Sequence, residues 1–270
     1  MFTIIFFYQK KILSMSSSPN KTALITGASV GLGRAIALEL ANNGYQLILL
    51  ARRTEKLQAL AAELVDTPTH LIACDINDRE SLLVELAKLP ADFADIDVLV
   101  NNAGLALGLV SADKAQWSDW QTMIETNRMS LAFMTRQILP RMVERNSGYI
   151  INLGSSAGSY AYKGGNVYGA SKAFVEHFSI SLRSDLLGTK VRVCNLVPGL
   201  IGGTEFSNIR FHGDDDSAAA VYQGCEALTP EDIAESVRWV LAQPAHVNIN
   251  SMEIMPVCQA PAGLAVDKKQ

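Results

Sequence analysis

The sequence predicts an α/β protein built on a doubly wound, parallel sheet of about seven strands flanked by helices. From Lys21 onward, short β-rich runs alternate with longer helix-like segments, as βαβ units require. Six of the seven runs are almost continuously apolar, which is typical of strands covered on both faces by helices. A glycine-rich turn joins the first run to the first helical segment.

Each element is expected from its own residues. The apolar runs predict strands at 22–26, 46–51, 69–74, 97–102, 148–154, 191–197 and 250–257. The segments between them predict helices at 32–43, 54–65, 78–88, 116–145, 166–187 and 229–242. The last helix has the clearest start, because Thr229 can cap it, Pro230 suits its first position and acids follow.

We expect residues 21–270 to form a single domain, because no repeat, low-complexity tract or linker divides them. Residues 1–20 are expected to be a disordered extension. Their apolar run precedes the first lysines, which reverses the order of a secretory signal, and it is shorter than the roughly 20 residues that span a bilayer. Met15 offers an alternative start of translation.

Charge and cysteine content argue against several classes of partner. The formal net charge is −4, so we expect no nucleic acid, whose binding rests on phosphate neutralisation. We also expect no membrane, because the N-terminal apolar run is too short to span one. The cysteines are widely spaced and neither they nor the histidines show metal-ligand spacing. We therefore expect no metal site, free thiols and a reducing, cytoplasmic compartment. The cysteines are Cys74, Cys194, Cys225 and Cys258.

The turn after the first strand has the pattern T-G-x3-G-x-G, with Gly27, Gly31 and Gly33. Glycine permits a positive φ, and its missing Cβ lets a pyrophosphate approach the backbone. The following helix start supplies free N–H groups to that anion. Because strand, turn and helix stand in the right order, we interpret the turn, with Ser29 and Leu32, as a dinucleotide site. The alternative is a purely structural turn.

At the end of the second strand, where an NAD site would carry an acid for the ribose 2′-hydroxyl, this chain has Ala51, followed by Arg52 and Arg53. Two arginines can form charge-assisted hydrogen bonds with a 2′-phosphate, and no acid stands at this position to repel it. The alternative is a solvated pair at a helix start, where the helix dipole disfavours cations. The sequence therefore predicts NADP as cofactor rather than NAD.

Tyr168 and Lys172 stand four residues apart and can share one helix face. A free phenol has a pKa of about 10, too high for reversible proton transfer near neutrality, and a nearby ammonium would lower it. Ser155 stands at the end of a strand, where doubly wound sheets place their ligands, and could donate to a substrate oxygen. These groups suit proton exchange with an alcohol while a hydride moves to the cofactor.

In combination, these motifs resemble the short-chain dehydrogenase/reductase family, with its Rossmann-type fold, over residues 21–260. The resemblance implies that Tyr168 is the general acid/base, Ser155 orients the substrate oxygen and Lys172 holds the nicotinamide ribose. Asn127 would support a proton-relaying water chain at a break in its helix. The matching segments are TGASVGLG (26–33), Asp75, NNAG (101–104), Asn127, Ser155, Tyr168 with Lys172, and PG (198–199).

The same resemblance implies further cofactor contacts. Thr204 would touch the carboxamide, although it lies one residue later than the family's threonine, where Gly203 stands here. The other contacts would be Asp75 and Ile76 at the adenine, Asn102, Ala103 and Gly104 beside the adenosine ribose, and Pro198 and Gly199 at the nicotinamide.

Longer segments, among them NNAGLALG and PGLIGGTEFSNIRF, resemble the branch of NADP-dependent 3-hydroxy acid dehydrogenases, also described as L-allo-threonine or L-serine dehydrogenases. This implies oxidation of the 3-hydroxyl of small acids such as L-serine, L-allo-threonine and 3-hydroxypropionate, or reduction of malonic semialdehyde. It also implies a homotetramer built through helices 116–145 and 166–187. Trp117, Trp120, Met123 and Phe133 would then lie in the interface or in the ordinary core.

A 3-hydroxy acid carries a carboxylate that needs a donor, and Arg210 is our candidate, with Asn166 and Lys163 as alternatives. Arg210 lies in a glycine-preceded, polar segment that could act as a mobile lid. It could equally pair with Asp214 or Asp215 on the surface.

Two other functions stay open. One is a short-chain dehydrogenase acting on another alcohol or ketone, and the other is a non-catalytic NADPH sensor. The intact set of Ser155, Tyr168, Lys172 and Asn127 argues against a sensor.

Overall fold

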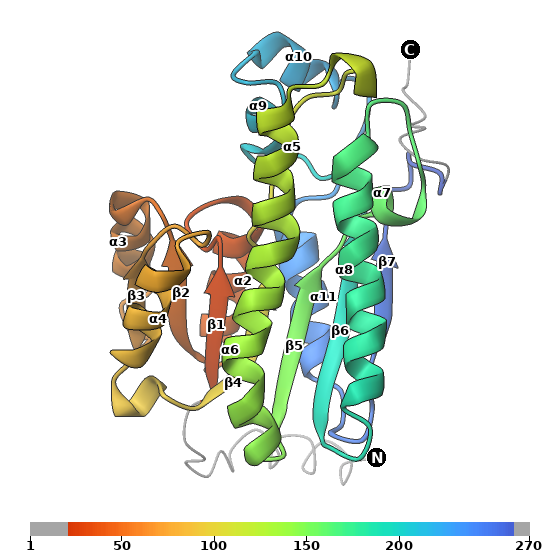
Figure 1. Cartoon of the computed structure of the whole chain (residues 1–270). Helices are drawn as coiled ribbons and strands as arrows, with labels where there is room; N and C mark the ends of the chain where they lie inside the picture. Colours follow the sequence, from red (N-terminus) through yellow and green to blue (C-terminus); the bar gives the residue numbers. More distant parts are fainter. Residues whose placement is uncertain (1–20, 262–270) are drawn as a thin grey trace, which may run out of the picture.

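The structure, a computed structural model, describes residues 21–261, so the expectations for residues 1–20 lie outside the described part. One sheet of seven parallel strands has the order β3-β2-β1-β4-β5-β6-β7 (Figure 1). This confirms the predicted fold class. The strand order reverses between β1 and β4, which opens a crevice at the carboxyl ends of the strands. The strands are β1 (Thr22–Thr26), β2 (Gln46–Ala51), β3 (Thr69–Ala73), β4 (Ile96–Asn101), β5 (Gly148–Leu153), β6 (Val191–Pro198) and β7 (Ser251–Ile254).

Each predicted helix is present, and the one expected at 116–145 is interrupted. It consists of α5 (Trp117–Ile124), a π turn η3 (Glu125–Met129) and α6 (Ser130–Glu144). The other long helices are α2 (Gly31–Asn42), α3 (Thr54–Glu63), α4 (Arg79–Ala87), α8 (Asn166–Asp185) and α11 (Pro230–Leu241). Short elements that the sequence did not predict are η1 (Ala91–Phe93), η2 (Ala112–Lys114), α7 (Ser156–Ser159), α9 (Phe206–Arg210) and α10 (Asp215–Ala220).

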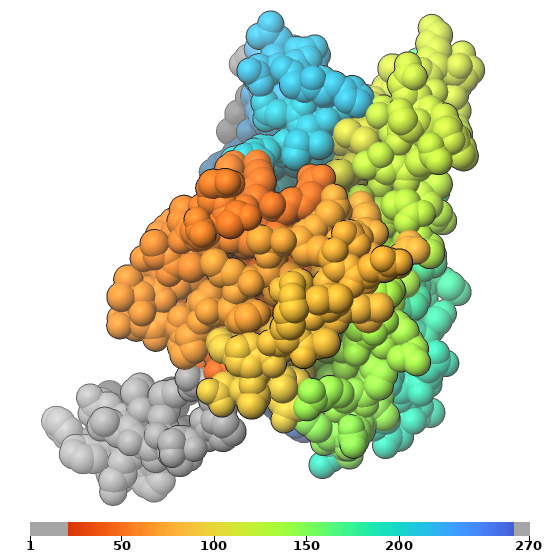
Figure 2. All heavy atoms as spheres, turned by 60° about the vertical axis from the view of Figure 1, so that its left-hand side comes forward, coloured from red at the N-terminus to blue at the C-terminus, as the bar shows by residue number. Residues whose placement is uncertain are grey.

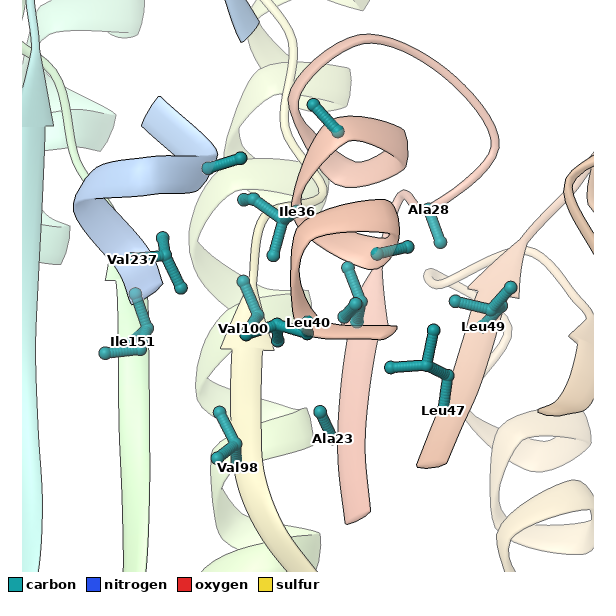
Figure 3. Packing of buried hydrophobic residues seen from close by; sticks show 14 of the residues in the cluster. Ala23, Ala28, Ile36, Leu40, Leu47, Leu49, Val98, Val100, Ile151 and Val237 are labelled. Atoms are coloured by element: carbon teal, nitrogen blue, oxygen red, sulfur yellow. The ribbon is translucent and has the colours of Figure 1, made fainter. Parts of the chain in front are cut away.

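Alternating strand residues divide the core into two layers. Ala23, Leu47 and Val98 face α2, α3 and α11, where Ile36 and Val237 pack against them (Figure 3). The neighbouring residues on each strand face α4, α6 and α8 on the opposite side. Both faces of the sheet are thus covered, which explains why the inner strands read as continuous apolar runs. The second layer includes Leu24, Ile48, Leu99, Ile150, Leu82, Met134 and Leu182.

The last strand is shorter than predicted. We expected 250–257, but β7 ends at Ile254 and is partly exposed along its length, as an edge strand is. Pro256, which has no N–H to donate to a ladder, follows shortly afterwards.

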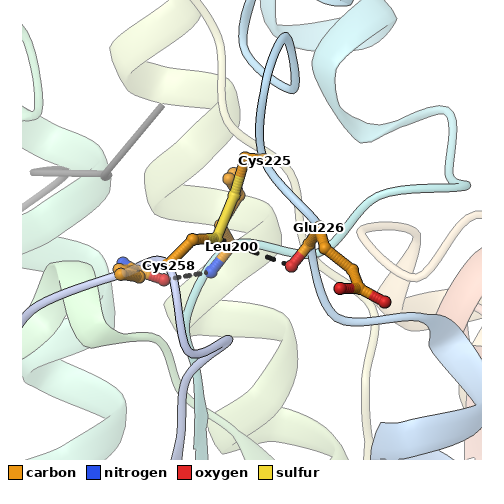
Figure 4. Close-up of a disulfide and its surroundings, with 5 residues drawn as sticks. Leu200, Cys225, Glu226 and Cys258 are labelled. Atoms are coloured by element: carbon orange, nitrogen blue, oxygen red, sulfur yellow. Dashed lines mark hydrogen bonds between the residues drawn. A yellow bond between two sulfur atoms is a disulfide. The ribbon is translucent and has the colours of Figure 1, made fainter. Parts of the chain in front are cut away.

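Cys225 and Cys258 form a disulfide, with a Cα–Cα distance of 6.2 Å (Figure 4). The expectation of free thiols is therefore wrong for this pair, whereas Cys74 and Cys194 are free and buried. The disulfide could not be predicted from the sequence, because 33 positions separate the two cysteines. The fold brings them together: the chain after β6 and the chain before α11 are bridged at Ile201 and Leu228, beside the residues that follow β7.

Candidate active site

A cavity of about 360 Å³ opens at the carboxyl end of the sheet. The structure brings most of the predicted site residues together around it, whereas Gly33, Asn127 and Asn166 lie outside its lining. The predicted residues that line it are Gly27, Ser29, Gly31, Leu32, Arg52, Arg53, Asp75, Ile76, Asn102, Ala103, Gly104, Ser155, Tyr168, Lys172, Pro198, Gly199, Thr204 and Arg210.

The glycine turn has the geometry of an anion cradle. Gly27 and Gly31 have φ values of 66° and 53°, which residues with a Cβ rarely adopt. A Cβ on Gly33 would collide with the Gly27 carbonyl oxygen, so helix α2 can start this close to the turn only with glycine there. Val30 gives α2 no side-chain cap, and its first turn holds no acid. The N–H groups of the helix start are therefore available to a phosphate.

The loop after β4 is fastened to this turn. The Thr26 hydroxyl accepts hydrogen bonds from the backbone N–H of Asn102 at 3.0 Å and of Ala103 at 2.9 Å. The Asn102 side chain donates to the Thr26 carbonyl at 2.8 Å. Residues 102–104 line the pocket, and the bonds to Thr26 hold Asn102 and Ala103 in place there.

Asn127 lies in the π turn between α5 and α6, which confirms the expected helix break. Its side-chain oxygen accepts from the Leu105 N–H at 2.9 Å, and its amide donates to the Leu105 carbonyl at 2.8 Å and to the Ser171 hydroxyl at 3.0 Å. The side chain therefore pins the loop after Gly104 to helix α8. Its role in a proton relay stays a prediction.

Ser155, Tyr168 and Lys172 meet where β5 ends. Ser155 caps the short α7, its hydroxyl oxygen accepting from the Ala157 N–H at 3.1 Å. Tyr168 lies on α8 with 9% of its surface exposed. Lys172, one turn further along, donates to the Leu153 carbonyl at 2.7 Å.

Burial dominates the titration of these groups. It raises the pKa of Tyr168 to about 12, while a hydrogen bond with Ser155 and the charge of Arg210 act to lower it. It lowers the pKa of Lys172 to about 8. The sequence led us to expect Lys172 as the cation that favours the phenolate. In the structure the Arg210 charge acts to lower the pKa of Tyr168, and the Lys172 ammonium donates to the Leu153 carbonyl.

Arg210 is a buried cation at the pocket, with 7% of its surface exposed. Its Nη2 donates to the Tyr162 hydroxyl at 2.5 Å, and its Nε has no hydrogen-bond partner among the described residues. The alternative of a surface ion pair is not realised. Asp214 accepts from the Ser217 N–H, and Asp215 accepts from Asn208. A buried cation without a carboxylate is costly unless a ligand supplies the anion.

The two alternative carboxylate donors do not reach the cavity. The Asn166 oxygen accepts from the Trp120 indole N–H at 3.1 Å, and its amide donates to the Val110 carbonyl at 3.2 Å. Lys163 is exposed and outside the lining. Asn166 therefore holds the loop before η2 instead of facing a substrate, which corrects its predicted role.

The other end of the pocket carries a cluster of cations. Arg52 lies 3.8 Å from Asp75, while Arg53 and Lys56 both pair with Glu205, from the segment after β6. Glu205, which lines the pocket, and its ion-pair partner Lys56 were not predicted from the sequence. Nor was Tyr162, whose only signal was an aromatic residue shortly before Tyr168.

Thr204 lines the pocket beside Gly31, where its methyl group lies 3.3 Å from the position of an added Cβ. Its hydroxyl accepts from the Phe206 N–H at 3.2 Å. Thr204 is therefore placed in the pocket despite the one-residue offset. No group of His, Cys, Asp and Glu within residues 21–261 could hold a metal ion, and no helix there is both long and apolar enough to cross a bilayer.

Comparison with known proteins gives consistent similarities. Residues 21–214 match the family described as short chain dehydrogenase. The chain is 56% identical over 245 residues to the NADP-dependent 3-hydroxy acid dehydrogenase YdfG of Salmonella typhi, covering 91% of this chain and 98% of that protein. It is 48% identical to the serine 3-dehydrogenase of Rhizobium radiobacter, covering 91% and 97%. A closed serine dehydrogenase complexed with NADP+ superposes with a TM-score of 0.87 at 54% identity, covering 88% and 96%.

Proposed function

The chain belongs to the short chain dehydrogenase family, and from that premise we propose that it is an NADP-dependent dehydrogenase of small 3-hydroxy acids such as L-serine, L-allo-threonine and 3-hydroxypropionate. The observation that carries the substrate class is Arg210, a buried cation at the pocket without a carboxylate partner among the described residues. The names of the relatives point to the same reaction.

The residues at the glycine turn fit NADP. The turn leaves helix N–H groups uncapped for the pyrophosphate, and Arg52, Arg53 and Lys56 gather where β2 ends. An acid at that strand end would instead favour NAD. When bound, NADP+ supplies the hydride acceptor for alcohol oxidation.

Three side chains would handle the alcohol. The Tyr168 oxygen takes the proton of the 3-hydroxyl, and the Ser155 hydroxyl donates to the substrate oxygen as its charge changes. Arg210 lines the pocket and holds the substrate carboxylate within reach of Tyr168, since its Cζ lies 5.2 Å from the phenol ring centre. Lys172 holds the nicotinamide ribose, and Asn127 supports a relay of the proton to solvent.

The test is NADPH formation by the purified protein with NADP+ and a panel of L-serine, L-allo-threonine, 3-hydroxypropionate and a plain secondary alcohol, with NAD+ as a control. We expect turnover on the acids with NADP+. Activity on the plain secondary alcohol alone would show that 3-hydroxy acids are not the substrates, whereas the proposed transfer of a proton to Tyr168 and a hydride to NADP+ would stand. Binding of NADPH with no turnover on any substrate would favour a sensor.

Two variants sharpen the test. Tyr168→Phe should abolish turnover while NADPH binding survives, because only the acidic hydroxyl is removed. Arg210→Met should raise KM for the 3-hydroxy acids far more than for the plain alcohol, whereas Arg210→Lys should recover part of the loss. An unchanged KM for the acids in Arg210→Met would remove Arg210 from the substrate site.

We further propose a homotetramer and a single domain; the last residues of the predicted range 21–270, 262–270, lie outside the described part. Trp117 on α5 and Ile180 on α8 are 64% and 55% exposed, which supports an interface along these helices. Met123 is fully buried and belongs to the core, and Trp120 and Phe133 are partly buried against it. Light scattering would give the subunit number, and a monomer would contradict the proposal.

A cytoplasmic location stays a prediction. The Cys225–Cys258 disulfide is the observation that opposes it, because such bonds are rare in that compartment. Fractionation of the cells that make the protein would decide the question.

A further inference from the structure

Glu205 joins the two halves of the pocket through its carboxylate. One oxygen lies 2.8 Å from Arg53 Nη2, and the other lies 2.6 Å from Lys56 Nζ. Arg53 and Lys56 belong to the start of α3, whereas Glu205 precedes α9 on the segment that follows β6. Figure 2 shows that segment, in cyan, standing above the orange region that carries α3. The ion pairs therefore cross the mouth of the cofactor site.

The carboxylate is charged and reachable from solvent. Hydrogen bonds from Arg53 and Lys56 hold the pKa of Glu205 below its ordinary value. Its side chain is 39% exposed, and those of both cations are 43% exposed. A second anion can therefore approach the same guanidinium and ammonium groups, and the Glu205 charge will oppose it.

We propose that Glu205 is a built-in competitor of the cofactor's 2′-phosphate for Arg53 and Lys56. The inference rests on the proposed NADP site. Glu205 occupies donors that a 2′-phosphate needs, so it lowers the affinity for that phosphate without touching the adenosine or the pyrophosphate. It is thus a specificity-determining residue that limits the preference for NADP over NAD and eases cofactor release. Arg210, the proposed partner of the substrate carboxylate, lies on the same segment as Glu205. A 2′-phosphate that displaces Glu205 from Arg53 and Lys56 therefore acts on the segment that also binds the substrate.

The test measures binding alone, using adenosine 2′,5′-bisphosphate and adenosine 5′-monophosphate as probes in isothermal titration calorimetry of the full chain. Glu205→Gln should bind the bisphosphate about three- to tenfold more tightly, the effect expected from releasing two exposed ion pairs, with monophosphate binding unchanged. Glu55→Gln is the matched control. It removes the same charge from the first turn of α3, at an exposed residue whose side chain makes no hydrogen bond or ion pair with another described residue.

Weaker or unchanged bisphosphate binding by Glu205→Gln would overturn the inference, the weaker result meaning that Glu205 orients the two cations for the phosphate. An equal gain in Glu55→Gln would also overturn it, because the effect would then be one of general charge. If NADP itself is not the preferred cofactor, the wild-type protein will bind the bisphosphate and the monophosphate equally well. This result differs from each of those that concern Glu205 alone.

Discussion

The Arg210 guanidinium carbon lies 5.2 Å from the centre of the Tyr168 ring, and its charge lowers the pKa of that phenol against the effect of burial. One side chain can thus serve both the substrate carboxylate and the proton acceptor. The two residues are far apart in the chain, since Arg210 belongs to the segment after β6 and Tyr168 to α8.

The first prediction concerns pH dependence. In the proposed mechanism, alcohol oxidation needs the Tyr168 phenolate, so we expect its rate to rise with pH. Removing the Arg210 charge should raise the pKa of the phenol further. Arg210→Met should therefore shift the rise of kcat for oxidation to higher pH, with Arg210→Lys shifted less. The measurement is the pH profile of kcat at saturating substrate. An unchanged profile in Arg210→Met would show that burial and Ser155 alone set this pKa.

The second prediction concerns Gly33. Its replacement by alanine places a Cβ against the Gly27 carbonyl oxygen, so the helix start must move away from the turn. We expect a loss of about 1–3 kcal/mol in the free energy of unfolding and a marked loss of NADPH affinity. Denaturant titration and fluorescence titration measure the two effects. The control is Gly44→Asn, at a positive φ with open space around it, where binding should survive.

The third prediction concerns Asn127, whose side chain makes three hydrogen bonds to Leu105 and Ser171. Asn127→Ala leaves buried polar groups unpaired and should cost about 1–3 kcal/mol of stability. Because the loop after Gly104 then loosens, NADPH affinity should fall together with kcat. A variant that lost only kcat, with stability and binding intact, would instead assign Asn127 to the proton relay alone.

The fourth prediction concerns the thiols. Titration of the denatured, unreduced protein should detect two free cysteines, Cys74 and Cys194, and prior reduction should raise the number to four. Four reactive thiols without reduction would contradict the disulfide. Cys225→Ser with Cys258→Ser should lower stability, because the bond closes a long loop in the unfolded chain.

The sequence predicted the sheet and its long helices because their signals are local. Buried strands appear in the sequence as apolar runs. Thr229 predicts the start of a helix, and in the structure it forms a capping box with Asp232. The central site was also predictable, because Tyr168 and Lys172 share one helix and Ser155 stands at a strand end.

Other parts of the site could not be predicted, because they depend on where distant segments meet. Nothing local connects Glu205 with Arg53, or Cys225 with Cys258. Asn166 was misassigned for a different reason. The side chain of a residue at a helix start can take several directions, and here Asn166 accepts a hydrogen bond from the Trp120 indole N–H.

The segment that carries Glu205 and Arg210 has both of its ends attached to the same base. At its start, the Gly199 N–H donates to the Ile254 carbonyl at 2.7 Å, and at its far end Cys225 is bonded to Cys258. The middle of the segment is attached as well, because the Gly108 N–H donates to the Arg210 carbonyl at 2.8 Å. Any displacement of Arg210 must therefore break that bond while both ends of the segment stay in place.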